Sequence, residues 1–277
     1  MTLLMTGAPV AKTILEEVAQ KVQDERVQPG LVVVQVGNDE ASSVYVGRKK
    51  ARADNLGFLS RSILLSENIT EQALLDCISN LNEDASVHGI LVQLPLPKHI
   101  HELTVLQHVA PQKDVDGFHP INAGHLFQGA PKFIPCTPMG IMKMLQFYNI
   151  PLLGKHAVVI GRSNIVGRPM ASLLEQANCT VTLCHSKTQN LSEILKMADI
   201  VVVAVGQANF VHGKDLKEGV VVIDVGINRL ESGMLCGDVH FESAQSKALA
   251  ITPVPKGVGP MTIACLMANT LQAALQK

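Results

Sequence analysis

Short apolar runs bounded by turn residues alternate along the chain with longer segments in which apolar positions recur every three to four residues. The first pattern predicts strands, and the second predicts amphipathic helices. In the first half the predicted strands are residues 31–36, 61–65 and 89–94, and the predicted helices are roughly residues 9–26, 43–56 and 70–82. This alternation indicates an α/β fold with largely parallel sheets.

The second half continues the alternation with runs that are apolar at almost every position. Its predicted strands are residues 157–160, 179–184, 200–205 and 220–225. Continuous apolar runs are typical of strands that have helices on both faces of their sheet. Proline and glycine punctuate residues 95–138, so we expect few regular elements there and a hinge beside a cleft. A last helix is predicted over residues 261–276.

Composition narrows the class of protein. The chain has 277 residues, 47% of them hydrophobic, which is enough for two domains with buried cores. A formal net charge of −1 without runs of like charge argues against a nucleic-acid partner. No apolar stretch approaches the ~20 residues that span a bilayer, and the first residues lack a secretory pattern. We therefore expect a cytoplasmic protein that does not bind membranes.

The six cysteines are scattered, and no two form a C-x-x-C pair. This spacing indicates neither a zinc site nor a disulfide framework, so we predict no metal. We expect the cysteines to be reduced and mostly buried. Cys136 either packs against the core or is a reactive thiol, and packing is the commoner role of a free cysteine.

A candidate nucleotide site follows the predicted strand 157–160. Gly161 and Gly167 bracket a turn, Pro169 stands where a first-turn proline is tolerated, and an apolar-periodic helix comes next. A strand–turn–helix of this kind points backbone N–H groups at a pyrophosphate. The spacing G-x-S-x-x-x-G is weak as a pattern alone, and its glycines would also suit a plain tight turn. The residues predicted to bind the cofactor are Gly161, Arg162, Ser163, Val166, Gly167, His185, Ser186, Gly206 and Ile227.

The end of the next strand indicates which nucleotide binds. Enzymes that use NAD usually place Asp or Glu there to accept from the ribose 2′-OH, whereas residues 184–188 contain no acid. Arg162, His185, Ser186 and Lys187 offer positive charge and donors to a 2′-phosphate instead. We predict NADP rather than NAD, although His185 and Lys187 would also suit a solvated loop.

Tyr45 and Lys49 lie four residues apart on a predicted helix and therefore share one face. Short-chain dehydrogenases use the same Y-x-x-x-K spacing, but they carry it after an N-terminal nucleotide motif. Here the pair comes more than a hundred residues before the glycine turn, so the order argues against that family. Without further support, such a pair is also compatible with a plain amphipathic surface.

Six separated motifs in a fixed order supply that support. They are residues 45–50, 89–97, 113–118, 135–138, 161–169 and 253–262. Together they resemble the bifunctional methylenetetrahydrofolate dehydrogenase/methenyltetrahydrofolate cyclohydrolase family over nearly the whole chain. The resemblance implies two α/β domains linked by two long helices, about 138–148 and 260–276, with folate in the cleft between them. It places residues 1–137 with 261–277 in an N-terminal catalytic and folate domain, and residues 138–260 in a Rossmann-like NADP domain.

The resemblance also assigns roles to single residues. It makes Lys49 the central catalytic group, Gln93 its hydrogen-bond partner, Tyr45 a pterin-stacking residue and Asp116 the pterin anchor. Asp114 is more easily explained by turn formation beside Gly117. The implied substrate-binding residues are Tyr45, Asp116, Gly257, Val258, Gly259 and Pro260. A homodimer is implied by the family alone, as is a place in one-carbon metabolism and purine biosynthesis.

One position departs from the family pattern. Lys256 stands where the family carries glycine, a residue that permits positive φ or close approach.

The residues suit both expected reactions. Oxidation of 5,10-methylenetetrahydrofolate to the methenyl form depends mainly on positioning, because the product cation is stabilised by its own flanking nitrogens. Hydrolysis to 10-formyltetrahydrofolate needs a base or proton relay. Lys49 can serve if burial and the cationic substrate favour its neutral form. The alternatives are a dehydrogenase of the same fold without hydrolase activity, and a non-catalytic NADP-binding regulator.

Overall fold

The computed structural model describes residues 2–276, and the side chains of all of them except 40–42. By their internal contacts the residues form two compact units. The six-stranded unit comprises Met1–Lys12 and Thr137–Thr262, and the three-stranded unit comprises Thr13–Cys136 and Ile263–Lys277. None of the described helices is long and apolar enough to cross a membrane. Residues 2–276 contain no group of acidic, histidine and cysteine side chains arranged to hold a metal.

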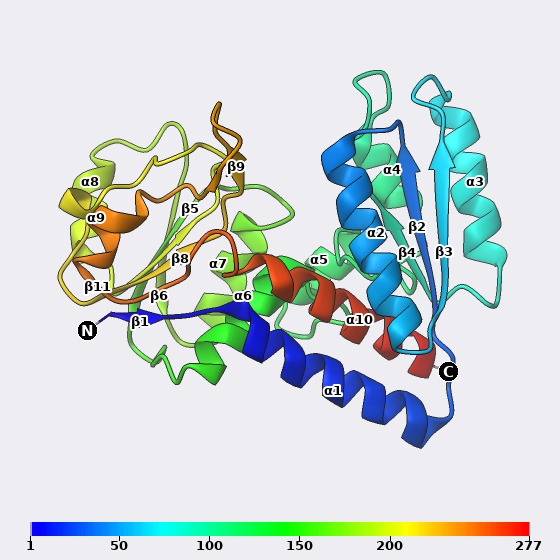
Figure 1. Ribbon diagram of the computed structural model, residues 1–277, viewed down its shortest axis with the longest axis horizontal. Coiled ribbons are helices and arrows are strands. Elements are labelled where there is room, and N and C mark those ends of the chain that lie inside the picture. The colour runs from blue at the N-terminus through cyan, green and yellow to red at the C-terminus, as the bar shows by residue number, and fades with distance from the viewer. Residues whose placement is uncertain (1, 277) are drawn as a thin grey trace. The chain divides into compact units, whose positions relative to one another are not determined.

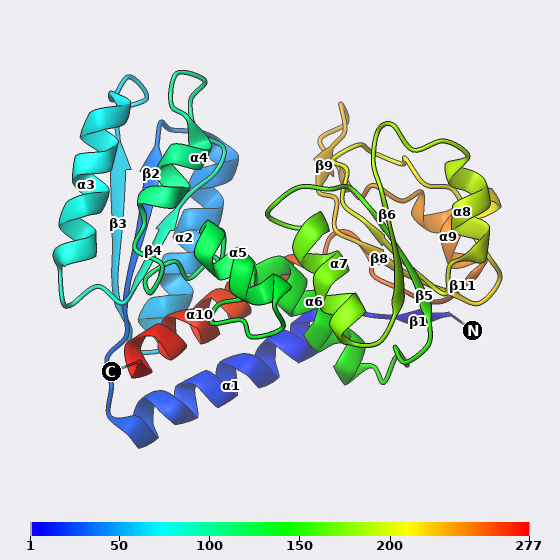
Figure 2. The same cartoon turned by 180° about the vertical axis from the view of Figure 1, so that it is seen from behind.

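The three-stranded unit is built on a parallel sheet in the order β3-β2-β4. Its strands are β2 (Gly30–Val36), β3 (Leu59–Leu65) and β4 (Gly89–Val92), and its main helices are α2 (Glu40–Asn55) and α3 (Glu71–Glu83). All three predicted strands and both helices are confirmed. Figures 1 and 2 show α2 on one face of the sheet and α3 with α4 (Glu102–His108) on the other.

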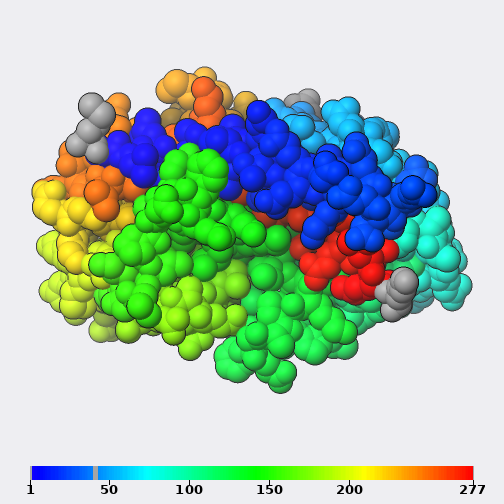
Figure 3. Space-filling model, turned by 90° about the horizontal axis from the view of Figure 1, so that it is seen from below, coloured from blue at the N-terminus to red at the C-terminus, as the bar shows by residue number. Residues whose placement is uncertain are grey.

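Alternate side chains of β2 explain these two layers. Val32, Val34 and Val36 pack with Leu74 and Ile78 of α3 in a buried apolar cluster. Successive strand residues point to opposite faces, so the equally buried Leu31 and Val33 face the other layer. Two further helices contribute to this unit, through residues 13–25 of α1 (Gly7–Glu25) and residues 263–275 of α10 (Gly259–Leu275). These two helices lie side by side (Figure 3).

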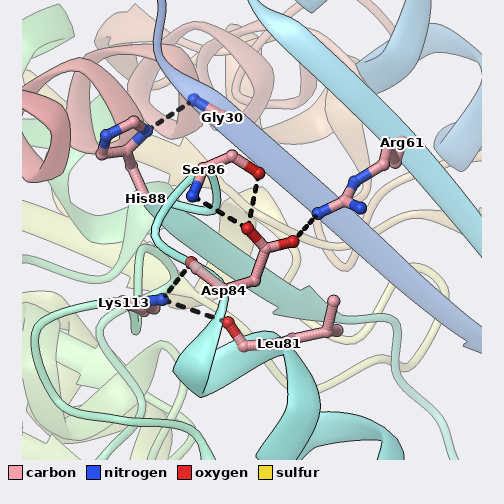
Figure 4. Close-up of polar contacts among 7 residues, drawn as sticks. All are labelled: Gly30, Arg61, Leu81, Asp84, Ser86, His88 and Lys113. Carbon is pink, nitrogen blue, oxygen red and sulfur yellow. Dashed lines mark hydrogen bonds and ion pairs between the residues drawn. The ribbon is translucent and has the colours of Figure 1, made fainter.

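A polar network closes the amino edge of this sheet (Figure 4). The Lys113 ammonium donates to the carbonyls of Leu81 and Asp84 at the end of α3, at 3.1 and 2.8 Å. The Asp84 carboxylate accepts from the backbone and hydroxyl of Ser86 and from Arg61 on β3. These hydrogen bonds, first that of the Ser86 hydroxyl, hold the pKa of Asp84 well below its ordinary value. The strands are thus tied at the end opposite to Gln93, which follows β4.

The expectation that residues 95–138 hold few regular elements is wrong. The segment contains α4 and α5 (Pro120–Phe127), both begun by histidine N-caps. Pro120 occupies the first turn of α5, where proline starts a helix because its missing N–H has no intrahelical partner. In this segment, proline therefore starts a helix at one position and interrupts regular structure at others.

The six-stranded unit contains a parallel sheet in the order β1-β11-β8-β7-β5-β6. The predicted strands are present as β5 (His156–Ile160), β6 (Thr180–Cys184), β7 (Ile200–Val203) and β8 (Val220–Asp224). Helix α7 (Gly167–Gln176) covers one face, and α8 (Leu191–Met197) and α9 (Phe241–Gln245) cover the other (Figure 2). The predicted helix 138–148 is α6 (Cys136–Phe147). The doubly wound, Rossmann-like class expected for this half is confirmed.

Two strands at the β1 end of this sheet were not predicted, the edge strand β1 (Leu3–Leu4) and its neighbour β11 (Ala248–Ile251). Because β1 pairs with β11, the chain from residue 2 to residue 12 lies with the six-stranded sheet. A short antiparallel hairpin of β9 (Asn228–Arg229) and β10 (Leu235–Cys236) follows β8.

The strand order locates the nucleotide edge. The chain runs from β5 outward to β6 and then returns to the other side of β5 as β7, so the order reverses at β5. In open α/β sheets, ligands bind beyond the carboxyl ends of the strands at such a reversal. The Gly161 turn therefore stands where a nucleotide is expected.

Candidate functional site

Lys49 and Gln93 meet in the three-stranded unit. Lys49 lies on α2 and is only 7% exposed, and its Nζ donates to Oε1 of Gln93 at 2.9 Å. Gln93 follows β4, where its backbone N–H continues the sheet by donating to Val34, and its amide donates to the Leu94 carbonyl. The acceptor oxygen of Gln93 is thereby turned toward the lysine. Tyr45 stands one helical turn before Lys49 and is half-buried.

Asp116 shares this environment. Burial raises its pKa to about 6, against the attraction of the Lys49 ammonium and with the repulsion of Asp114. The residue as a whole is only partly buried, so a ligand can approach the loop that carries it. Lys49, Gln93 and Asp116 therefore form one polar cluster inside a single unit.

Asp114 has a different role from Asp116. It is buried and accepts from the backbone N–H groups of Phe118 and His119 and from the Asn122 amide, at 3.1, 2.8 and 2.8 Å. Its carboxylate thus holds the turn that leads into α5.

Cys136 is a buried structural thiol next to the cluster. It is 2% exposed, within hydrogen-bonding reach of Asp116, and 3.5 Å from the Val115 carbonyl. Burial, followed by the negative charge of Asp116, raises the pKa of this thiol well above its ordinary value. A neutral, enclosed thiol is a poor nucleophile, so the structure favours packing over reactivity for Cys136.

Sequence reasoning missed Asn269, which supports the loop that carries Asp116. This buried residue of α10 donates from Nδ2 to the carbonyls of Val115 and Ile134, at 2.8 and 3.0 Å. One amide therefore joins the segment before Asp116 to the segment before Cys136. The available signal was a polar side chain within a predicted helix that is mostly apolar.

The glycine turn of the six-stranded unit is shaped by close approach. Gly161 has φ +111°, and a Cβ there would overlap the carbonyl oxygen of Ala204. A Cβ at Gly167 would overlap the carbonyl oxygen of Gly161, so both positions require glycine. Ser163 Oγ accepts from the N–H groups of Val166 and Gly167, at 3.2 and 3.3 Å. This leaves a compact backbone cradle at the start of α7, as a pyrophosphate site needs.

The loop after β6 presents donors without an acid. His185 accepts at Nδ1 from the Lys187 N–H at 3.1 Å, which leaves Nε2 as the ring nitrogen that can donate to a ligand. Ser186 and Lys187 are exposed, as is Arg162 in the glycine turn. This chemistry fits a 2′-phosphate better than a ribose 2′-OH.

The 253–260 loop lies in the same unit, next to Ile227. A Cβ at Gly259 would lie 3.9 Å from Cδ1 of Ile227. A predicted cofactor residue and the predicted substrate loop are therefore neighbours. At Gly257, a Cβ would overlap the Pro253 carbonyl oxygen, so the loop is tightly folded. Lys256 has φ +87°, and its carbonyl accepts from the Gly7 N–H at 2.9 Å.

Two features of the fold and the sites together define the class of this protein. A doubly wound sheet with a glycine cradle at its reversal point, and a buried lysine cluster in a second α/β unit, define a nucleotide-dependent α/β enzyme. Residues 5–116 match the family model for the tetrahydrofolate dehydrogenase/cyclohydrolase catalytic domain, and residues 135–277 match that for its NAD(P)-binding domain. The chain belongs to the tetrahydrofolate dehydrogenase/cyclohydrolase family.

Individual relatives agree with this placement over their full length. The bifunctional protein FolD of Streptococcus thermophilus is 53% identical over 100% of this chain and 99% of its own. The crystal structure of the Campylobacter jejuni FolD dehydrogenase/cyclohydrolase superposes with a TM-score of 0.96 at 49% identity, covering 99% of each chain. The Trypanosoma brucei FolD enzyme, solved with NADP and an inhibitor, has a TM-score of 0.93 at 38% identity, covering 98% of this chain and 97% of its own.

Lys256 gives a testable consequence. A side chain at positive φ costs of order 1 kcal/mol, so Lys256→Gly should raise the free energy of unfolding by about 1 kcal/mol. Denaturant unfolding measures this difference. Lys98→Gly, at an exposed turn position outside the positive-φ residues, should give no gain. A Lys256→Gly protein that is less stable than the wild type would show that the lysine is not strained.

Proposed function

We propose that the protein oxidises 5,10-methylenetetrahydrofolate with NADP⁺ and hydrolyses the methenyl product to 10-formyltetrahydrofolate. The observation that carries the proposal is the buried Lys49, hydrogen-bonded to Gln93 and close enough to Asp116 to affect its charge. A lysine without such neighbours would favour a dehydrogenase that lacks the second activity. The three-stranded unit is proposed as the catalytic and folate domain, and the six-stranded unit as the NADP domain.

The cofactor fits the residues present. The Gly161–Gly167 cradle suits a pyrophosphate, and Arg162, His185 and Ser186 suit a 2′-phosphate. When bound, NADP⁺ supplies the hydride acceptor for the methylene carbon. We assign the cradle to the cofactor, and Tyr45, Asp116 and residues 257–260 to the folate substrate. Positioning is the main requirement of this step.

Hydrolysis requires a side chain that accepts a proton, in addition to positioning. Water adds to the methenyl carbon, one carbon–nitrogen bond of the bridge breaks, and a proton is released. We assign the uptake of that proton to Lys49 Nζ, which is held by its hydrogen bond to Gln93 Oε1. Gln93 keeps the amine in line, and Tyr45 stacks on the pterin, which the Asp116 carboxylate anchors.

We also propose that the protein works as a homodimer in the cytoplasm and feeds formyl groups to purine biosynthesis. The family resemblance supports the dimer. Large apolar side chains stand exposed on the single chain, among them Leu64 at 63% and Phe127 at 83%. Light scattering of the purified protein would measure its mass in solution.

The cofactor preference is the first prediction of this proposal. We expect kcat/KM for NADP⁺ to exceed that for NAD⁺ by at least about tenfold, or roughly 1.4 kcal/mol, because donors converge near the 2′-phosphate. Arg162→Ala should cost NADP⁺ far more than NAD⁺ in NADPH or NADH formation at 340 nm. Arg52→Ala, an exposed arginine on α2, is the control. Equal use of both cofactors by the wild type would contradict the assignment of Arg162, His185 and Ser186.

Asp116 should control folate binding in both reactions. Asp116→Ala is expected to raise KM for each folate substrate, because one carboxylate anchors substrate and intermediate alike. The pKa of Asp116 is raised to about 6, so in the wild type the anchoring charge is lost as pH falls through this value. The folate KM should therefore rise below about pH 6, and Asp116→Asn should abolish this dependence. If Asp116→Ala lost only one of the two activities, Asp116 would not be the residue that anchors the pterin.

Lys49 should separate the two activities. Lys49→Gln keeps a hydrogen-bonding side chain but removes the amine, so hydrolysis should be lost almost entirely while oxidation remains measurable. Methenyltetrahydrofolate absorbance and NADPH formation report the two steps in one preparation. Gln93→Lys should also impair hydrolysis, through repulsion between two ammonium groups.

The neighbouring lysine provides a matched control. Lys50 lies on the same helix but is exposed and paired with Asp54. Lys50→Gln should therefore keep both activities. Normal hydrolysis by a folded Lys49→Gln protein would exclude the lysine from the mechanism.

A further inference from the structure

Two buried carboxylates in the six-stranded unit are not used by the proposed chemistry. Asp224 ends β8 and is 4% exposed, and Asp238 follows β10 and is 0% exposed. A buried charge is costly unless hydrogen bonds compensate it. Both carboxylates receive such bonds almost wholly from backbone N–H groups.

Asp238 is held by the loop that follows β7. Its Oδ2 accepts from the N–H groups of Val205 and Gly206, at 2.7 and 2.9 Å, and its Oδ1 accepts from the Gln207 N–H at 2.9 Å. The Asn228 amide donates a fourth bond to Oδ1 at 2.9 Å. Three successive N–H groups directed at one anion form the kind of backbone nest that binds phosphate in other proteins. Here the chain fills the nest with its own carboxylate.

Asp224 fixes the segment that carries Asp238. Its Oδ1 accepts from the N–H groups of Gly226 and Asp238, at 3.0 and 2.9 Å, and its Oδ2 accepts from Val239 at 2.9 Å. The backbone N–H of Asp224 in turn donates to Thr252 Oγ1 at 2.8 Å. The two acids therefore link the ends of β7, β8 and β11 into one framework.

Two glycines make room for the acids. A Cβ at Gly226 would overlap the carboxylate of Asp238, and a Cβ at Gly237 would overlap that of Asp224. The glycine beyond β8 is thus required by a carboxylate of the chain itself. Gly226 does not need a bound ligand to explain it.

The framework formed by the two acids lies at the β7 and β8 side of the cofactor site, away from the β6 end. The β6 end, with His185 and Ser186, suits the adenosine 2′-phosphate, and the glycine cradle after β5 suits the pyrophosphate. A dinucleotide that crosses the reversal point at β5 continues over the ends of β7 and β8. Gly206 and Ile227 lie at these two ends.

We propose that Asp238, supported by Asp224, is a positioning residue for the nicotinamide half of the cofactor. By occupying the 205–207 nest, the carboxylate keeps phosphate away from β7, directs the pyrophosphate to the Gly161–Gly167 cradle, and holds the β7 and β8 loops to receive the nicotinamide nucleoside. This inference rests on the proposed NADP site. The two acids then position one half of the ligand in addition to stabilising the fold.

Asp238→Asn tests the proposal by changing only one oxygen to an amide group. The NH₂ group then faces N–H donors at one end of the nest, so the loop must move. We expect the dissociation constant for NADP⁺ to rise at least tenfold. Binding of adenosine 2′,5′-bisphosphate, which carries only the adenosine half, should stay within about twofold. Calorimetry measures both ligands.

The controls separate this role from a general loss of structure. Asp114→Asn makes the same change at a buried, loop-holding carboxylate of the other unit and should leave NADP⁺ binding unchanged. Methenyltetrahydrofolate hydrolysis, assigned to Lys49, should persist in Asp238→Asn. Equal weakening of both ligands, or unchanged NADP⁺ binding, would overturn the proposal.

A milder variant covers the case in which Asp238→Asn does not fold. Asn228→Ala removes one of the four bonds to Asp238 and keeps its charge. It should weaken NADP⁺ several-fold and spare the bisphosphate, and no effect on NADP⁺ would overturn the proposal. Failure of the wild type to bind adenosine 2′,5′-bisphosphate would instead contradict the proposed cofactor.

Discussion

Parallel pairing of the strands is the constraint from which both sites follow. Because every strand of the two main sheets runs in the same direction as its neighbours, the loops that follow the strands collect at one edge of each sheet. In the three-stranded unit this edge carries Gln93, next to the Asp116 loop. In the six-stranded unit it carries the Gly161 turn and the loops after β6, β7 and β8. At the opposite edge of the smaller sheet, the network around Asp84 and Lys113 ties strands and helix together.

The acidic residues show how the chain distinguishes structural charge from charge kept for a ligand. Asp114, Asp224 and Asp238 each accept two or three backbone N–H groups, which fixes a turn or a loop end. No described residue donates a backbone N–H to Asp116, whose neighbours are Lys49 and the Cys136 thiol. A half-buried carboxylate with spare acceptor capacity gains by binding a donor from outside. Its incomplete hydrogen bonding therefore singles out Asp116 among these four acids.

The sequence predicted what local patterns encode, and missed what depends on distant pairing. Short apolar runs bounded by turn residues predicted all seven strands, and the glycine turn predicted the cradle at α7. Leu3–Leu4 was missed because two apolar residues form a strand only when β11 lies beside them. Helices α4 and α5 were missed because proline usually interrupts a helix, whereas Pro120 starts one. Lys49 and Gln93 are separated by 44 positions, so family resemblance, rather than periodicity, brought them together.

The burial of the cysteines has a practical consequence for measuring local stability. The chain contains no tryptophan, so its intrinsic fluorescence is a weak probe of unfolding. Cys136 and Cys265 are buried in the three-stranded unit, and Cys179 and Cys184 in the six-stranded unit. Each thiol becomes reactive toward an alkylating reagent only when its surroundings open. Pulsed alkylation read out by mass spectrometry would therefore report the opening free energy of each unit separately, with no engineered label.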